Sequence, residues 1–140
     1  MNRTLLKYAS IFFVCLIGLI ACKPKVERPH TALDTGRVFI RASLDGDFKT
    51  AENLLLKDSE SVQLFDRYKL YYNRISDVEK KNFKSADYMI NKYSDENDST
   101  TIINYSNSFI NRPMEIKVVK TGGDWWVDFS YISSGNLPLN

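Results

Sequence analysis

The chain has 140 residues, with 19 basic and 17 acidic side chains and a formal net charge of +2. So small a charge gives little long-range attraction to a phosphate backbone, so no nucleic acid partner is expected. A single histidine and two cysteines disfavour catalytic triads and zinc sites built from several His or Cys ligands.

Residues 1–21 have the layout of a secretory signal peptide. Arg3 and Lys7 precede an apolar stretch from Tyr8 to Ala21, which is shorter than the roughly 20 residues of a membrane-spanning helix. We therefore expect cleavage between Ala21 and Cys22. Removing Arg3 and Lys7 makes basic and acidic residues equal in number, so the remaining chain is close to neutral.

The run Leu19-Ile20-Ala21-Cys22 resembles the lipobox of bacterial lipoproteins. The resemblance implies that the Cys22 sulfur receives a diacylglycerol and that Cys22 becomes the acylated first residue, which anchors the chain to a membrane. The alternative is an ordinary signal anchor with an incidental cysteine. Lys23 is not the aspartate that retains enterobacterial lipoproteins in the inner membrane. The expected location is therefore the cell envelope, on the outer membrane facing the periplasm.

Signal cleavage and lipidation would leave no free thiol, because Cys15 is removed and Cys22 is acylated. We therefore expect no disulfide, no cysteine nucleophile, no metal site and no cofactor. His30 lies in residues 22–31, a polar segment with two prolines that is typical of a solvated tether.

Residues 32–132 are expected to form one domain that begins with helices. Residues 32–45 predict a helix capped by Asp34 that buries Val38, Phe39 and Ala42, and Gly46 ends it. Asp47 is expected to cap a second helix. A third runs from Ser59 or Ser61 to about Asp77, and residues 77–83 add a turn or continue it. Its apolar stripe consists of Val62, Phe65, Tyr68, Tyr72 and Ile75.

Strands are expected in the second half of the chain. Residues 87–93 and 100–107 predict two strands joined by a polar turn at 94–99. Met114, Ile116 and Val118 mark one face of a third strand, and Gly122-Gly123 predicts a tight hairpin. The fourth strand carries one face made of Trp125, Val127, Phe129 and Tyr131. Residues 133–140 are expected to form a loose tail.

Helices followed by an antiparallel meander predict an α+β fold, with the helices packed on one face of a curved sheet of about four strands. Residues 39–51 resemble the opening helical hairpin of nuclear-transport-factor-2-like domains, and residues 123–128 resemble their closing hairpin. The resemblance implies a cone-shaped domain in which the sheet wraps a helix around a cavity. The matching motifs are short, and the family contains both enzymes and binding domains, so the fold does not decide the function.

Aromatic side chains are the candidates for lining such a cavity. They are Phe39, Tyr68, Tyr72, Trp125 and Phe129. Tyrosine hydroxyls there would orient a small apolar ligand. Plain core packing is the favoured interpretation of the same residues.

Two further positions are candidates on the last strand. Neighbouring residues of a strand point to opposite faces, so Trp125 and Trp126 cannot both face inward, and we expect Trp126 to face outward as a contact residue or under a covering side chain. Asp128 is the candidate general base of an enzymatic alternative, but alternation places it opposite Val127, which favours a solvated or salt-bridged carboxylate. The acidic residues 95–98 lack the spacing of a calcium loop, so no metal is expected there.

The leading hypothesis is a membrane-anchored, non-enzymatic binding or scaffold domain for a small apolar ligand or an envelope protein, with no catalytic residues. One alternative is a histidine-free isomerase or hydrolase that uses a cavity carboxylate. Another is an inhibitor or immunity-type protein that binds through the outer sheet face. A buried carboxylate in an enclosed pocket would favour the enzyme, and a cavity filled by Phe and Tyr side chains would exclude it.

Overall fold

The computed structural model describes residues 27–132. The expected signal peptide, Cys22, half of the tether and the 133–140 tail lie outside these residues. The helices are α2 (Ala32–Asp45), α3 (Phe48–Leu54), α4 (Ser59–Arg74), α5 (Asp77–Ser85) and α6 (Phe129–Ile132), and the strands are β1 (Tyr88–Asn97), β2 (Thr100–Asn107), β3 (Pro113–Thr121) and β4 (Asp124–Asp128).

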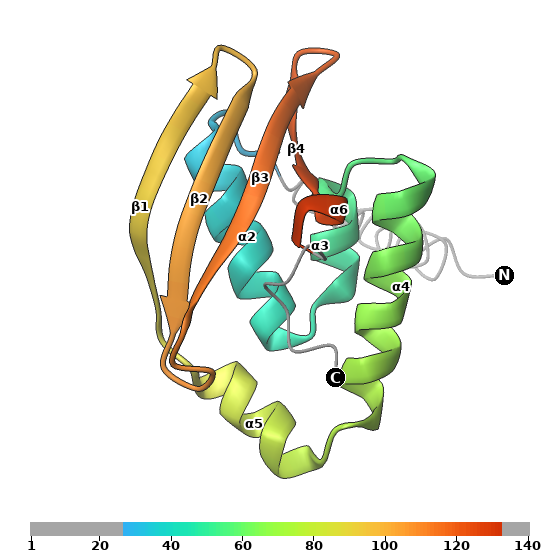
Figure 1. Ribbon diagram of the computed structural model, residues 1–140. Coiled ribbons are helices and arrows are strands. Elements are labelled where there is room, and N and C mark those ends of the chain that lie inside the picture. The colour runs from blue at the N-terminus through green and yellow to red at the C-terminus, as the bar shows by residue number, and fades with distance from the viewer. Residues whose placement is uncertain (1–26, 133–140) are drawn as a thin grey trace, which may run out of the picture.

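The four strands form one antiparallel sheet in the order β1-β2-β3-β4, and the helices lie on one of its faces (Figure 1). Helix α2 packs across β2, β3 and β4, and α3 and α4 form the layer behind it. The predicted α+β class is therefore confirmed. The face that carries Ile103, Ile116 and Val118 is called the inner face here, because it packs against the helices in the core.

The helical hairpin at the start of the domain is fixed by local caps. Thr31 caps α2, because its side chain accepts a hydrogen bond from the Asp34 backbone N–H at 3.1 Å. The prediction that Asp34 is the cap was wrong; its carboxylate instead accepts from the Thr31 hydroxyl at 2.8 Å. The predicted roles of Gly46 and Asp47 are confirmed. Gly46 ends α2 at φ 71°, and Asp47 caps α3 by accepting from the Thr50 N–H at 3.2 Å.

The predicted third helix is two helices. Asp58 caps α4, which ends at Arg74 because Ile75 has an extended backbone. Ser76 and Glu79 then form a capping box that begins α5. The chain thus restarts a helix where the sequence analysis left open a turn or a continuation of the same one.

The buried faces of the helices differ slightly from the predicted stripes. Val38 and Val62 are exposed, so including them was wrong, whereas Ser61 is fully buried. Gly36 allows α2 to approach the sheet closely, because a Cβ there would lie 2.4 Å from Ile103 Cδ1 and 3.2 Å from Ile116 Cδ1. On the same helix, the Phe39 ring lies 5.9 Å from the Phe65 ring of α4.

Two strand boundaries depart from the predictions. β1 continues to Asn97, so the polar turn is shorter than residues 94–99. β4 ends at Asp128, and Phe129 and Tyr131 lie in the short helix α6 instead of on a strand face. The physical reason is a capping interaction, because Asp128 Oδ1 accepts hydrogen bonds from the Ser130 backbone N–H at 3.1 Å and from its hydroxyl at 2.5 Å.

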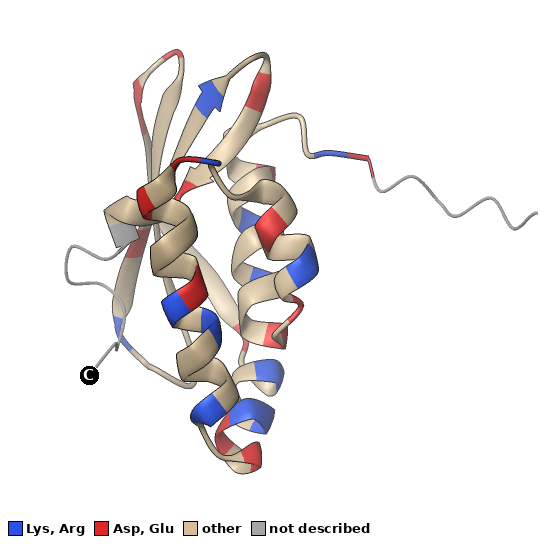
Figure 2. Ribbon diagram, turned by 90° about the vertical axis from the view of Figure 1, so that its right-hand side faces the viewer, with Lys and Arg blue, Asp and Glu red and all other residues tan. Residues whose placement is uncertain are grey.

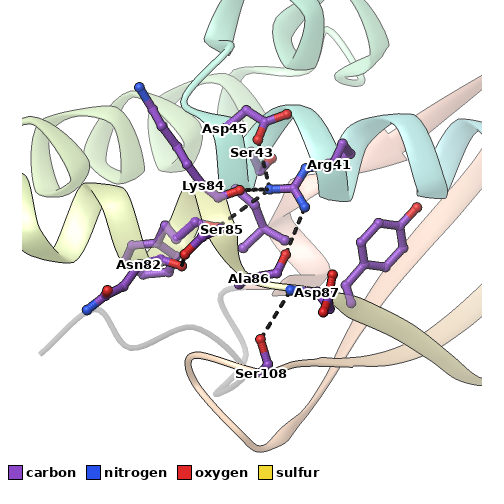
Figure 3. Close-up of polar contacts among 12 residues, drawn as sticks. Arg41, Ser43, Asp45, Asn82, Lys84, Ser85, Ala86, Asp87 and Ser108 are labelled. Atoms are coloured by element: carbon purple, nitrogen blue, oxygen red, sulfur yellow. Dashed lines mark hydrogen bonds and ion pairs between the residues drawn. The ribbon is translucent and has the colours of Figure 1, made fainter.

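Arg41 ties the helical layer to the start of the sheet (Figure 3). Its guanidinium donates to the carbonyl oxygens of Ala86 at 2.8 Å and Lys84 at 3.1 Å, and it pairs with Asp45 at 2.8 Å. The Lys84 carbonyl lies in the last turn of α5 and the Ala86 carbonyl belongs to its C-cap residue, where carbonyls lack partners within the helix. Arg41 therefore has a structural role in joining α2 to α5.

Charged side chains of both signs alternate over the exposed helix faces (Figure 2). The described surface therefore has no large region of a single sign on this side.

Candidate binding site at the turn end of the sheet

Four of the five residues predicted to line a cavity pack against one another in the core. The ring centroid of Phe129 lies 6.1 Å from that of Phe39 and 6.0 Å from that of Tyr68, and Tyr68 lies 6.5 Å from Tyr72. Phe65 fills the remaining space, 5.9 Å from Phe39 and 5.1 Å from Phe129. These separations are those of contacting rings, so the cluster leaves no room for a ligand between them.

The hydroxyls of the two tyrosines are also engaged. Tyr68 donates to the Ser43 carbonyl at 3.2 Å and Tyr72 donates to the Leu44 carbonyl at 3.4 Å. Burial raises the pKa of both phenols, and the neighbouring Tyr105 contributes to the rise at Tyr68. Both groups therefore stay neutral and hold the end of α2 against α4.

Trp125 departs from this cluster and borders an open hollow of about 670 Å³. We call it the sheet-end hollow. It lies on the inner face, between the start of α2 and the two hairpin turns. Its lining residues are His30, Thr31, Ala32, Leu33, Tyr93, Asp95, Asn97, Asp98, Thr101, Lys120 and Trp125.

The hollow exists because the strands are longer than the helix that covers them. Both hairpins project past the first turn of α2, as Figure 1 shows. Near the turns, Asp95 pairs with Thr101 and Lys120 pairs with Trp125, and these inner-face residues line the hollow together with Ala32 and Leu33 at the start of α2. The sequence is correspondingly polar there, and Tyr93 stays 54% exposed.

Polar groups in the hollow are held in place by short contacts. Thr101 donates its hydroxyl hydrogen bond to Asp95 at 2.6 Å, and Asn97 accepts from both the N–H and the hydroxyl of Ser99 at 2.9 Å. The Lys120 ammonium lies 5.6 Å from the centre of the Trp125 ring. The hollow thus combines two aromatic side chains, Tyr93 and Trp125, with hydrogen-bonded acceptors and the Lys120 ammonium.

Trp126 lies on the outer face, as predicted. The Arg28 guanidinium stacks 3.9 Å from its ring centre, and the indole N–H donates to the Thr121 carbonyl at 3.2 Å. Trp126 is half-buried as a result. The covering side chain is therefore that of Arg28, in the segment before α2, which matches the alternative of a covering side chain.

Asp128 is salt-bridged, one of the two forms that the sequence favoured, but it is buried instead of solvated. Its carboxylate lies 2.7 Å from the Lys117 ammonium, its partner across the strand pair. Burial alone would raise the pKa of Asp128, but the hydrogen bonds from Lys117 and Ser130 outweigh burial and hold the pKa below its ordinary value. A general base needs a raised pKa, so the geometry of Asp128 suits an ion pair and helix cap rather than proton transfer.

A second hollow of about 570 Å³ lies on the outer face. Its lining includes Lys92, Ser94, Glu96, Glu115 and Tyr131. Tyr131 donates to Glu115 at 3.0 Å, so this surface is polar and already hydrogen-bonded. It is the face that the inhibitor-type alternative would use.

Within residues 27–132, no group of three or more His, Cys, Asp or Glu side chains could hold a metal ion. His30 is exposed and lies 3.5 Å from Glu27. In the same described range, no helix has the length and apolar character needed to cross a membrane.

Comparisons with known proteins gave no match. No protein-family model matches the chain, and neither a curated protein nor a solved structure is significantly similar to it.

Sequence reasoning missed most of the sheet-end hollow, because its lining comes from three separate segments of the chain. A usable signal was present in β1. Tyr93 and Asp95 alternate on the face that should be apolar if a helix covered it. An acidic residue on an inner strand face indicates that the covering layer has ended.

Proposed function

We propose that this chain is a lipid-anchored lipoprotein of a bacterial cell envelope whose domain binds a small, partly apolar ligand without transforming it. The sheet-end hollow is the observation that carries the binding function. It is open and lies beside residues 30–33, the point where the tether enters the domain. A ligand from the envelope would therefore meet the hollow at the end of the domain nearest the anchor.

The enzymatic alternative is less well supported. The aromatic cluster occupies the space that a cone cavity would need, and Asp128 is paired with Lys117. The element order, a helical hairpin followed by helices and a four-stranded meander, supports membership of the nuclear-transport-factor-2-like superfamily as part of this proposal. In such a domain, the aromatic cluster would fill the central cavity, and the ligand would bind instead in the sheet-end hollow at the edge of that cavity.

Ligand binding is tested with the neutral apolar dye N-phenyl-1-naphthylamine, followed by its fluorescence on the purified full-length chain. We expect saturable binding that Trp125→Ala weakens by about tenfold, because an aromatic wall of the hollow is removed. Trp126→Ala is the matched control, since the neighbouring indole lies on the opposite face. Absence of binding, or equal losses in the two variants, would contradict the proposed site.

The anchor is tested separately by Cys22→Ser. We expect this variant to accumulate as an uncleaved precursor that does not incorporate an alkyne-labelled palmitate, because the lipid-accepting sulfur of Cys22 is gone. Chain mass and labelling of the membrane fraction measure the result. Normal processing and lipid labelling in the variant would refute the lipoprotein proposal without affecting the dye experiment.

A further inference from the structure

The two edges of the sheet are not equivalent. The β1 strand is hydrogen-bonded to β2 on one side, and its other side is unpaired among the described residues. β1 pairs only with β2, and no other described element lies beside it (Figure 1). An unpaired strand edge presents a row of N–H and C=O groups that can bind another strand. On β1 this edge is accompanied by exposed apolar side chains, since Met89 is 64% and Tyr93 54% exposed.

The regular part of this edge is short and well defined. The pairing of β1 with β2 shifts register at Asn91 and again at Glu96, which leaves residues 92–95 as an uninterrupted stretch. Lys92, Ser94 and Glu96 line the outer-face hollow together, so they share one face. Tyr93 and Asp95 line the sheet-end hollow on the other face.

This arrangement is complementary to itself. If two β1 strands lie antiparallel with Ser94 opposite Ser94 of a second copy, Lys92 of each copy faces Glu96 of the other. On the inner face, each Tyr93 faces the other copy's Asp95. A register centred on Tyr93 instead places Lys92 opposite Ser94 and loses both ion pairs. Opposite charges across an antiparallel pair are favourable, and like charges are not.

We propose that two copies of this chain associate through antiparallel β1 strands centred on Ser94, which joins both four-stranded sheets into one continuous sheet. A twofold axis perpendicular to the sheet keeps the helices of both copies on the same side. The interface is isologous, so each Lys92–Glu96 contact occurs twice.

The association also changes the candidate site. Tyr93, Asp95 and Asn97 form the β1 side of the sheet-end hollow, and the same strand carries the interface. In the dimer the two hollows meet across the joined strands, and each receives a wall from the second copy. The dimer would therefore bind a longer or twofold-symmetric ligand that a single copy holds only in part.

Disulfide trapping tests the register. In the full-length chain in membranes, Ser94→Cys places two sulfurs on the axis, where facing Cα atoms are roughly 4.5–5.5 Å apart, within the range that a disulfide spans. We expect mild oxidation to convert most of this variant to a covalent homodimer. Lys92→Cys is the matched control on the same strand and face, because its two copies are four residues out of register, roughly 13 Å apart. The unsubstituted chain sets the background from Cys15 and Cys22.

A homodimer band for Ser94→Cys alone supports the proposal. No cross-link, equal cross-linking of both variants, or a cross-linked product with a different protein would overturn it.

Charge exchange tests the proposed pairs independently. In detergent solution, Lys92→Glu is expected to weaken dimerisation by about tenfold, because two attractive pairs become repulsive. Combining it with Glu96→Lys should restore the original affinity, since the charges are exchanged. Light scattering on the full-length chain measures the molar mass. A monomeric parent chain, or a single reversal without effect, would refute the interface.

Discussion

The two edge strands of the sheet, β4 and β1, differ in whether their free backbone groups are covered. We call the covered β4 edge the sealed edge and the β1 edge the open edge. At β4, the Leu56 N–H donates to the Val127 carbonyl at 2.9 Å, and the chain then turns into α6, where the Phe129 N–H donates to the Ser61 hydroxyl at 3.2 Å. At β1, nothing among residues 27–132 plays this part. The segments that cover the β4 edge therefore pack against it. The side chains on β1 are not needed to cover its edge.

The side chains reflect this difference. Leu55, Val127 and Phe129 at the β4 edge are all buried, whereas Met89 and Tyr93 on β1 are exposed. Substitutions at the sealed edge should therefore lower the stability of the single chain. Substitutions at the open edge should change association or ligand binding and leave the folded state almost unaffected.

The largest effect is expected from Phe129→Ala. Phe129 is 2% exposed and contacts Phe39, Phe65 and Tyr68, so its removal leaves a cavity at the centre of the aromatic cluster. The expected loss in the free energy of unfolding is about 3–5 kcal/mol, measured by urea denaturation. Phe109→Ala is the control, because Phe109 is partly exposed and contacts the Phe83 ring. Equal losses in both variants would contradict this description of the sealed edge.

A smaller effect is expected from Ser61→Ala. The Ser61 hydroxyl is fully buried and accepts the hydrogen bond of the Phe129 backbone N–H. Its removal leaves that donor buried without its partner, at a cost of about 1–3 kcal/mol. Ser59→Ala, two residues earlier in α4 and exposed, should cost less. Equal thermal stability of the two variants would show that the hydrogen bond from the Phe129 N–H to Ser61 does not stabilise the β4 edge.

The sequence predicted elements best where local chemistry decides them. Gly46, Asp47 and Gly122-Gly123 specify their turns directly, because positive φ angles and caps are local requirements. Predictions failed where a distant contact decides. Phe129 alternates correctly for a strand, but Asp128 caps a helix there. Val38 continues a stripe, yet it stays 39% exposed among residues 27–132.

The candidate site was less predictable than the fold. Trp125 was identified, but its partners Tyr93, Asp95 and Lys120 come from strands whose lengths relative to α2 cannot be derived from periodicity. The core aromatics were identified correctly as inward-facing, yet only their ring separations show that they fill the interior. Sequence patterns give the face on which a side chain lies, and not whether the space beside it is occupied.

The sealed edge should also respond to pH through Asp128. Its pKa is lowered in the folded state, because the hydrogen bonds from Lys117 and Ser130 outweigh the effect of burial. Its contribution to stability is therefore complete above the ordinary aspartate pKa of about 4 and is lost as the pH falls through the lowered folded value. Asp128→Asn should lose less stability than the parent chain between about pH 5 and pH 3.

Asp124→Asn is the control for this pH effect, since Asp124 is exposed at the other end of β4. Urea denaturation at several pH values measures the difference. Parallel stability profiles for the parent chain and Asp128→Asn would show that the Lys117 pair contributes nothing at the sealed edge.

The smallest effect on stability is expected at the open edge itself. Tyr93→Ser and Met89→Ser remove exposed side chains, so each should change the free energy of unfolding of the dilute chain by no more than about 0.5 kcal/mol. Tyr93→Ser should nevertheless weaken dye binding, because Tyr93 lines the sheet-end hollow, whereas Met89 does not. A loss of stability comparable to that of Ser61→Ala would mean that these β1 side chains pack against other parts of the single chain. The two edges would then differ only in their backbone hydrogen bonds, because side chains at both edges would contribute to the free energy of unfolding of the single chain.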